Sequence, residues 1–133
     1  MLIERVRTEP DPYEPFLLSQ AIRAGDLLFV SGQAGYDDSG RPVPGGFDAQ
    51  AAQAFANLER ALRAGGSSLA DVVKVTIFVT DMAANFPKVV ELRRQHFTPP
   101  YPADSIVEVS SLYVPDAEIE IEAIAVVGAK RPA

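Results

Sequence analysis

Residues 71–82 read DVVKVTIFVTDM, and this stretch decides the fold of the chain. Valine, isoleucine and threonine, whose branched side chains favour extended backbone, make up most of residues 72–79. Asp81 follows at a position where an aspartate side chain can accept hydrogen bonds from the first turn of a helix. The stretch therefore predicts a strand that leads directly into a helix.

The predicted helix after Asp81 has a counterpart before the strand. Apolar residues recur at spacings of three and four between residues 47 and 62, which indicates one buried face of an amphipathic helix. The pair Gly65 and Gly66 is expected to end this first helix. Prolines at positions 99, 100 and 102 are expected to end the second. The core face of the second helix is predicted from its apolar residues: Phe86, Val89, Val90 and Phe97.

Five further strands are expected at residues 2–7, 19–24, 27–31, 105–109 and 119–127. The order β-β-β-α-β-α-β-β describes one α+β domain over residues 1–133, with both helices on one face of the sheet. The last strand is apolar on both faces toward its end. Because two helices cover only one face, we expect a second subunit to cover the other.

Composition excludes several kinds of function. The chain has 133 residues, no cysteine, one histidine (His96) and a net charge of −6. Thiol catalysis and disulfides are therefore excluded, no histidine cluster for a metal can form within one chain, and nucleic acid is not the expected partner. No apolar run is long enough for a membrane span and no glycine-rich phosphate loop occurs, so a cytoplasmic protein without a nucleotide cofactor is expected.

Four blocks resemble one known family. Residues 29–33 (FVSGQ), 54–58 (AFANL), 71–82 and 120–125 (EIEAIA) are similar, in the same order, to motifs of the YjgF/RidA family. The resemblance extends over about residues 19–127. It implies a chorismate-mutase-like fold and a homotrimer with three small-molecule clefts between its subunits. It also implies hydrolysis, without metal or cofactor, of reactive enamines and imines such as 2-aminoacrylate.

Three pocket positions depart from the family pattern. The signature Pro-Ala-Arg-Ser is here residues 102–105 (PADS), so that Asp104 stands where the family has the arginine that binds a carboxylate. Leu18 replaces a family tyrosine, with Phe16 nearby as a substitute, and Val90 replaces an asparagine. Arginine pairs with both oxygens of a carboxylate, whereas an ionised aspartate repels it. Deamination of 2-aminoacrylate is therefore expected to be weak or absent.

Asp104 and Glu120 are the predicted catalytic residues. If both face one cleft, their mutual repulsion separates their pKa values and leaves one acid and one base to activate water. The alternative for Asp104 is a pair with a surface lysine or arginine, and for Glu120 a structural ion pair. Arg93 and Arg94 are interpreted as a solvated helix face. The predicted ligand-binding residues, which surround the same cleft, are Ser31, Gly32, Phe16, Leu18, Val90, Tyr101 and Ser105.

The first hypothesis is a cofactor-free hydrolase that deaminates an imine-like or enamine-like metabolite other than 2-aminoacrylate. The alternative is a non-catalytic trimer that binds a small molecule or acts as a chaperone. Ribonuclease activity is the least favoured hypothesis, because the net charge of −6 leaves no basic patch for RNA.

Overall fold

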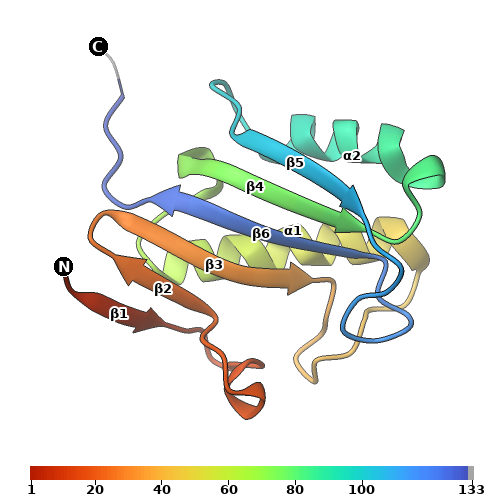
Figure 1. The fold of residues 1–133 in the computed structure, drawn as a ribbon, viewed down its shortest axis with the longest axis horizontal. Helices are drawn as coiled ribbons and strands as arrows, with labels where there is room; N and C mark the ends of the chain where they lie inside the picture. Colours follow the sequence, from red (N-terminus) through yellow and green to blue (C-terminus); the bar gives the residue numbers. More distant parts are fainter. Residues whose placement is uncertain (132–133) are drawn as a thin grey trace.

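A computed structural model describes residues 1–131 and contains one mixed sheet of six strands, in the order β1-β2-β3-β6-β4-β5. Only β4 and β5 pair in parallel. Both long helices lie on the same side of this sheet (Figure 1). The predicted order of strands and helices is thus confirmed. The strands are β1 (Ile3–Val6), β2 (Ala21–Ala24), β3 (Leu27–Ala34), β4 (Val72–Val79), β5 (Ala103–Glu108) and β6 (Ile119–Val126), and the helices are α1 (Gly46–Ala64) and α2 (Met82–His96), with short 3-10 helices η1 (Glu14–Phe16) and η2 (Leu69–Asp71).

The stretch that decides the fold behaves as predicted. Strand β4 covers residues 72–79, and α2 begins three residues later at Met82. The Asp81 side chain accepts a hydrogen bond from the backbone N–H of Ala84 at 3.1 Å, which caps the first turn. The change from strand to helix is therefore fixed by local sequence.

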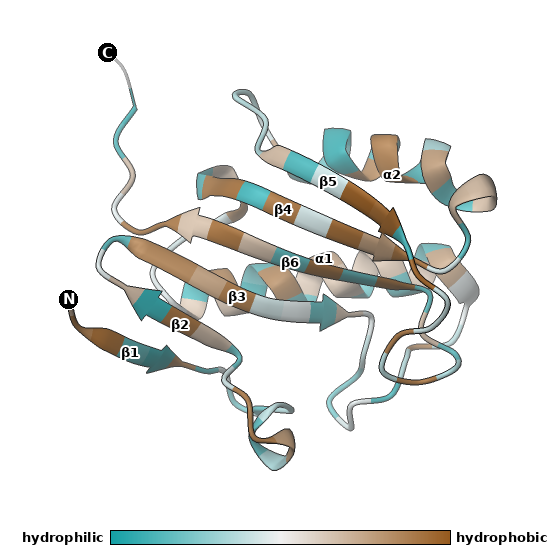
Figure 2. Ribbon diagram, viewed as in Figure 1, coloured by the Kyte–Doolittle hydropathy of each residue, from teal (hydrophilic) through white to brown (hydrophobic). Residues whose placement is uncertain are grey.

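The core lies between the sheet and α1. Ile119 and Ile121 on β6 are fully buried, and they share this layer with Leu58 and Leu62 of α1. Hydrophobic colour extends along β3, β4 and β6, the central strands of the sheet (Figure 2). On β6 buried residues alternate with partly or fully exposed ones, as the period of a strand requires.

The predicted core face of α2 is wrong for two of its four residues. Val89 and Phe97 are buried, whereas Phe86 and Val90 keep 46% and 38% of their surface exposed. The helix lies near the edge strand β5, where the sheet ends (Figure 1). Only one row of its apolar side chains therefore meets the core, and the neighbouring row faces solvent.

The face of the sheet away from the helices, called the open face below, carries exposed apolar side chains. Leu27, Phe29 and Val107 each keep at least 40% of their surface exposed there. Phe29 pairs with Ile124, and Val107 with Phe78, so the apolar positions are adjacent across strands. This agrees with the apolar second face expected from the sequence.

Candidate functional site

Glu120 lies on the open face, where β6 passes a bulge in β3. The pairing of β3 with β6 shifts register between Val30 and Gln33, so Ser31 and Gly32 fall within the irregularity. A Cβ atom added to Gly32 would lie 2.7 Å from Cδ of Glu120. The carboxyl group therefore packs directly against a backbone that only glycine leaves accessible.

Tyr13 is a site residue that sequence analysis missed. Its hydroxyl donates a hydrogen bond of 2.7 Å to the carbonyl oxygen of Gly32. The family tyrosine was sought instead at Leu18 and Phe16, whose side chains are 45% and 76% exposed. The available signal was a tyrosine between two prolines, Pro12 and Pro15, in the same N-terminal loop.

The surroundings of Glu120 favour its protonated form. Burial, and secondly the charge of Glu122, raise the pKa of the Glu120 carboxyl above its ordinary value. Burial, and secondly Glu120, raise the pKa of Tyr113 to about 12. The Tyr113 hydroxyl donates to the carbonyl oxygen of Gly40 at 3.1 Å, which ties two loops together near the carboxyl. Glu120 is thus a carboxyl with a raised pKa, and the pKa values of the neighbouring Tyr13 and Tyr113 phenols are raised as well.

The hydroxyl of Ser31 is already committed to the backbone. Its Oγ donates to the carbonyl oxygen of Ser19 at 2.6 Å. Its carbonyl oxygen accepts from Nε2 of the fully buried Gln33 at 3.0 Å, and the Tyr36 hydroxyl in turn donates to Oε1 of Gln33 at 2.7 Å. Ser31 therefore shapes the bulge beside Glu120 rather than offering an unengaged hydroxyl.

Asp104 lies on the opposite side of the sheet from Glu120. It is paired in register with Val75, on the helix-covered face, whereas Glu120 is paired with Phe78 on the open face. Within one subunit the two predicted catalytic carboxyls therefore do not meet. Successive residues of a strand face opposite sides of the sheet, and the β4 partners of these two residues, Val75 and Phe78, face opposite sides. Only a second subunit could bring the two carboxyls into one cleft.

The carboxylate of Asp104 is held by Arg93 of α2. Arg93 Nε donates to Oδ2 at 2.8 Å and Nη2 donates to Oδ1 at 2.9 Å, with the side chains 26% and 15% exposed. The alternative reading of Asp104, a pair with a basic residue, is therefore the observed one. The interpretation of Arg93 as part of a solvated face is wrong, because its guanidinium contacts the carboxylate of Asp104 on β5 and is largely removed from solvent.

A cavity of about 280 Å³ opens beside this ion pair. Ser105 does not reach it: the side chain is on the open face, where Lys74 Nζ donates to its hydroxyl at 2.9 Å. The predicted site residues thus form two groups, one around Glu120 and one at the edge of α2 and β5. The cavity is lined by Val90, Arg93, Arg94, Phe97, Tyr101, Pro102 and Asp104.

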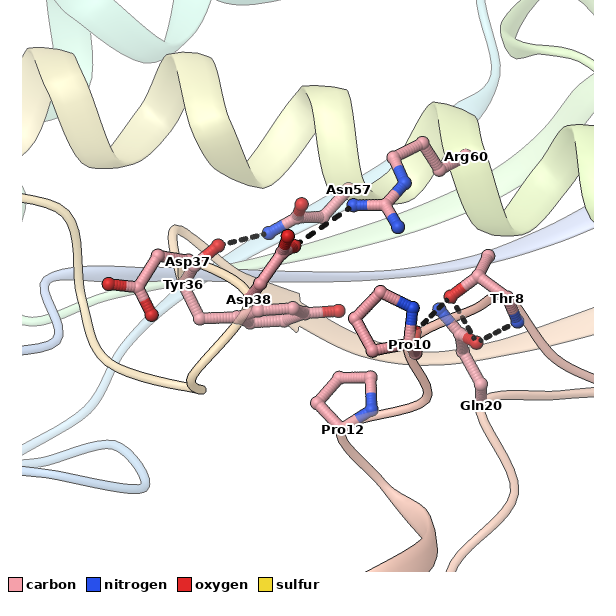
Figure 3. A pocket seen from close by; sticks show the side chains of 9 residues that line it. All are labelled: Thr8, Pro10, Pro12, Gln20, Tyr36, Asp37, Asp38, Asn57 and Arg60. Atoms are coloured by element: carbon pink, nitrogen blue, oxygen red, sulfur yellow. Dashed lines mark hydrogen bonds and ion pairs between the residues drawn. The ribbon is translucent and has the colours of Figure 1, made fainter.

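A second hollow lies beneath the N-terminal loop (Figure 3). Its volume of about 10 Å³ has room for roughly one water molecule. Oε1 of Gln20 accepts hydrogen bonds from the backbone N–H and the hydroxyl of Thr8, and Asn57 donates to the carbonyl oxygen of Tyr36. These contacts fix the loop that carries Tyr13, and none of the predicted site residues lines the hollow.

Residues 1–131, which the structure describes, offer neither a metal site of the usual kind nor a membrane-crossing helix. They bring together no set of three or more histidine, cysteine, aspartate or glutamate side chains suited to a metal ion. None of their helices combines the length and hydropathy that a membrane crossing requires.

Comparison with known proteins shows to which family the chain belongs. The family model described as Endoribonuclease L-PSP matches residues 6–127. RutC family protein PH0854 of Pyrococcus horikoshii is 44% identical over 117 residues, which are 87% of this chain and 90% of that protein. The 2-iminobutanoate/2-iminopropanoate deaminase of Bos taurus is 38% identical over 111 residues, or 83% of this chain and 80% of that protein.

Solved structures give the same result. RidA from the Antarctic bacterium Psychrobacter sp. PAMC 21119 matches with a TM-score of 0.84 at 34% identity, over 93% of this chain and 99% of that one. Yeast Mmf1 matches with a TM-score of 0.86 at 36% identity, over 95% and 99%. The chain belongs to the YjgF/RidA family.

Proposed function

We propose that the protein hydrolyses the imine or enamine of a small metabolite to a carbonyl compound and ammonia. The observation that carries this proposal is the half-buried Glu120 carboxyl, whose pKa is raised by burial and by Glu122. A carboxyl whose pKa is raised is a stronger base than an exposed glutamate once it is ionised. The names of relatives such as the Bos taurus deaminase support the same chemistry.

The chemistry needs only water and one proton-transferring group. Ionised Glu120 takes a proton from water as the oxygen attacks the carbon of the protonated imine, which gives a neutral carbinolamine. Glu120 returns this proton to the carbinolamine nitrogen, the C–N bond breaks and ammonia leaves, while the ionised Glu120 accepts the hydroxyl proton so that the carbonyl forms. Glu120 then loses that proton to solvent. An enamine enters the same sequence after it is protonated on carbon to give the imine. No electrons are transferred to or from the protein.

We propose further that each cleft is built by two subunits of a homotrimer. The Glu120 group on the open face would come from one subunit, and the cavity beside Asp104 from its neighbour. The exposed Leu27, Phe29 and Val107 support this arrangement, because a second copy of the sheet would remove them from water. We place this assembly in the cytoplasm, although one relative bears the name Protein MMF1, mitochondrial.

Light scattering at micromolar concentration tests the assembly. We expect a mass close to three times the chain mass of 14.3 kDa. Replacing Phe29 by lysine places a charge in the apolar face, and this variant is expected to dissociate into folded monomers and to lose activity. A wild-type protein that is monomeric, folded and active would refute the two-subunit cleft.

Ammonia release from imines generated in solution tests the substrate. We expect an imine or enamine other than 2-aminoacrylate to be hydrolysed about 100-fold faster than 2-aminoacrylate itself, because the arginine that the resemblance places on β5 to bind the carboxylate of that small substrate is replaced by Asp104. Each rate is compared with spontaneous hydrolysis in the same buffer. Equal, uncatalysed rates across the whole panel, together with ligand binding, would instead support the non-catalytic hypothesis.

A further inference from the structure

Arg93 has donors that Asp104 does not use. A guanidinium group carries five N–H donors, and the pair with Asp104 engages Nε and one N–H of Nη2. No acceptor within residues 1–131 is found for Nη1. Across the same residues, no buried side-chain nitrogen lacks a partner, so Nη1 is not sealed inside the protein. The end of the fork formed by Nη1 and Nη2 is therefore open to solvent.

Arg93 is also one of the residues that line a cavity large enough for a small organic molecule. Arg93 lines the cavity of about 280 Å³, together with the apolar side chains of Val90, Phe97 and Tyr101. The lining residues include two arginines and one aspartate, and the second arginine, Arg94, pairs with Glu91 outside the lining. Both positive charges are thus partnered, so the feature that favours an anion is the set of unused N–H donors on Arg93 and not an excess of charge.

Asp104 also orders the guanidinium. A bidentate pair fixes the plane of the guanidinium group. The N–H donors that Asp104 does not use are therefore held in one direction, whereas an unpaired arginine side chain would point them in many directions. The neighbouring Arg94 is different: it pairs with Glu91 on the same helix, and its side chain is 68% exposed. Of the two arginines, only Arg93 is held in place by another element of the fold.

We propose that Arg93 is a specificity-determining residue whose outer edge binds the carboxylate of a ligand in this cavity, with Asp104 as its positioning residue. The anion-binding group is thus supplied by α2 and no longer by β5. This inference rests on the proposed function for its biological setting, but its ligand class follows from the cavity alone. The repulsion that was expected between Asp104 and a ligand carboxylate is also removed, because the negative charge of Asp104 is already paired with Arg93.

Benzoate and benzamide test the proposal, because they share a shape and differ in charge. Titrations of the full-length protein, followed by NMR chemical shifts, should give at least 10-fold tighter binding of benzoate, with the largest shifts at the Arg93 side chain. Arg93→Lys keeps the charge but loses the fork, and we expect it to reduce the benzoate preference to less than about 3-fold. Arg94→Lys is the matched control and should retain the full preference.

Asp104→Asn separates positioning from folding. It leaves Arg93 charged but loosely held, so benzoate should bind about 3- to 10-fold more weakly than to the wild type. If either single variant unfolds, the double variant Arg93→Gln with Asp104→Asn restores an uncharged pair, and it should fold without a benzoate preference. Equal binding of the two probes by the wild type, or a preference that Arg93→Lys keeps and Arg94→Lys loses, would overturn the proposal.

The two proposals can fail separately. Neither probe is hydrolysed, so the benzoate preference is measured without reference to catalysis. A protein that hydrolyses imines but binds both probes equally retains the proposed function and refutes the role of Arg93. A protein that prefers benzoate in an Arg93-dependent manner, but hydrolyses no imine, supports the role of Arg93 and refutes the proposed function.

Discussion

Replacing Glu120 by glutamine is expected to lower imine hydrolysis by about 10²- to 10⁴-fold, the usual contribution of a proton-transferring side chain. Glutamine keeps the size of the side chain and its packing against Gly32, but it cannot accept a proton from water. Ammonia release under substrate saturation measures the effect. A variant with more than about a third of wild-type activity would exclude Glu120 as the base.

Glu122→Gln is the matched control, since Glu122 is an exposed residue on the same face of β6. Glu122 raises the pKa of Glu120, and the base acts in its ionised form, so the wild-type rate should increase with pH through that raised pKa. Removing the Glu122 charge should lower the pKa of Glu120 and so move the rising part of the pH–rate profile to lower pH, while the maximal rate stays the same. If the rising part of the pH–rate profile lies at the same pH in the variant and the wild type, a group other than Glu120 controls the profile.

The stability of the Glu120→Gln variant distinguishes lost chemistry from lost folding. The folded-state pKa of Glu120 lies above its unfolded value, so its contribution to stability is present below the unfolded pKa and is lost as pH rises through the folded pKa. Glutamine mimics the protonated form at every pH. We therefore expect the variant to melt at or above the wild-type temperature near pH 8, which thermal unfolding at matched protein concentration would show.

Replacing Gly35 by alanine is expected to destabilise the fold by about 3 kcal/mol, at the upper end of the usual cost of overpacking a core. The added Cβ would lie 2.3 Å from the carbonyl oxygen and 2.6 Å from Cα of Gln50. Both atoms belong to the backbone of α1, so the helix itself must move away from the sheet. The melting temperature should fall by roughly 10 °C for a chain of this length.

Gly32→Ala is the comparison that gives this result its meaning. It makes the same chemical change three residues earlier, but the three heavy atoms nearest to the new methyl group all belong to the side chain of Glu120. That side chain can rotate away, so we expect a loss of activity with a much smaller loss of stability. Equal melting temperatures for the two alanine variants would contradict the backbone contact described for Gly35.

Local pattern was sufficient for most of the fold. The branched residues of β4, the cap at Asp81 and the alternation along β6 each specify their own backbone, and these elements lie where they were expected. The faces of α2 were harder to predict. Val89 and Val90 are equally apolar, and only the position of the helix near the sheet edge decides which of them is buried.

The site could be predicted only in part, because its geometry depends on pairings between distant segments. Similarity of sequence indicated Glu120 and Gly32, and the structure brings them into contact. Whether Asp104 shares their side of the sheet depends on the register of β5 against β4, to which neither strand alone is a guide. The pair of Arg93 with Asp104 likewise requires the packing of α2 against β5 to be known.

The bidentate contact between Arg93 and Asp104 also constrains how such a protein can evolve. Substituting either residue alone leaves a partly buried charge without its partner, which is strongly destabilising. A lineage that moves its guanidinium from the strand to the helix must therefore pass through a less stable intermediate or acquire both substitutions together. The helix position and the strand position are therefore expected to change together and not one at a time.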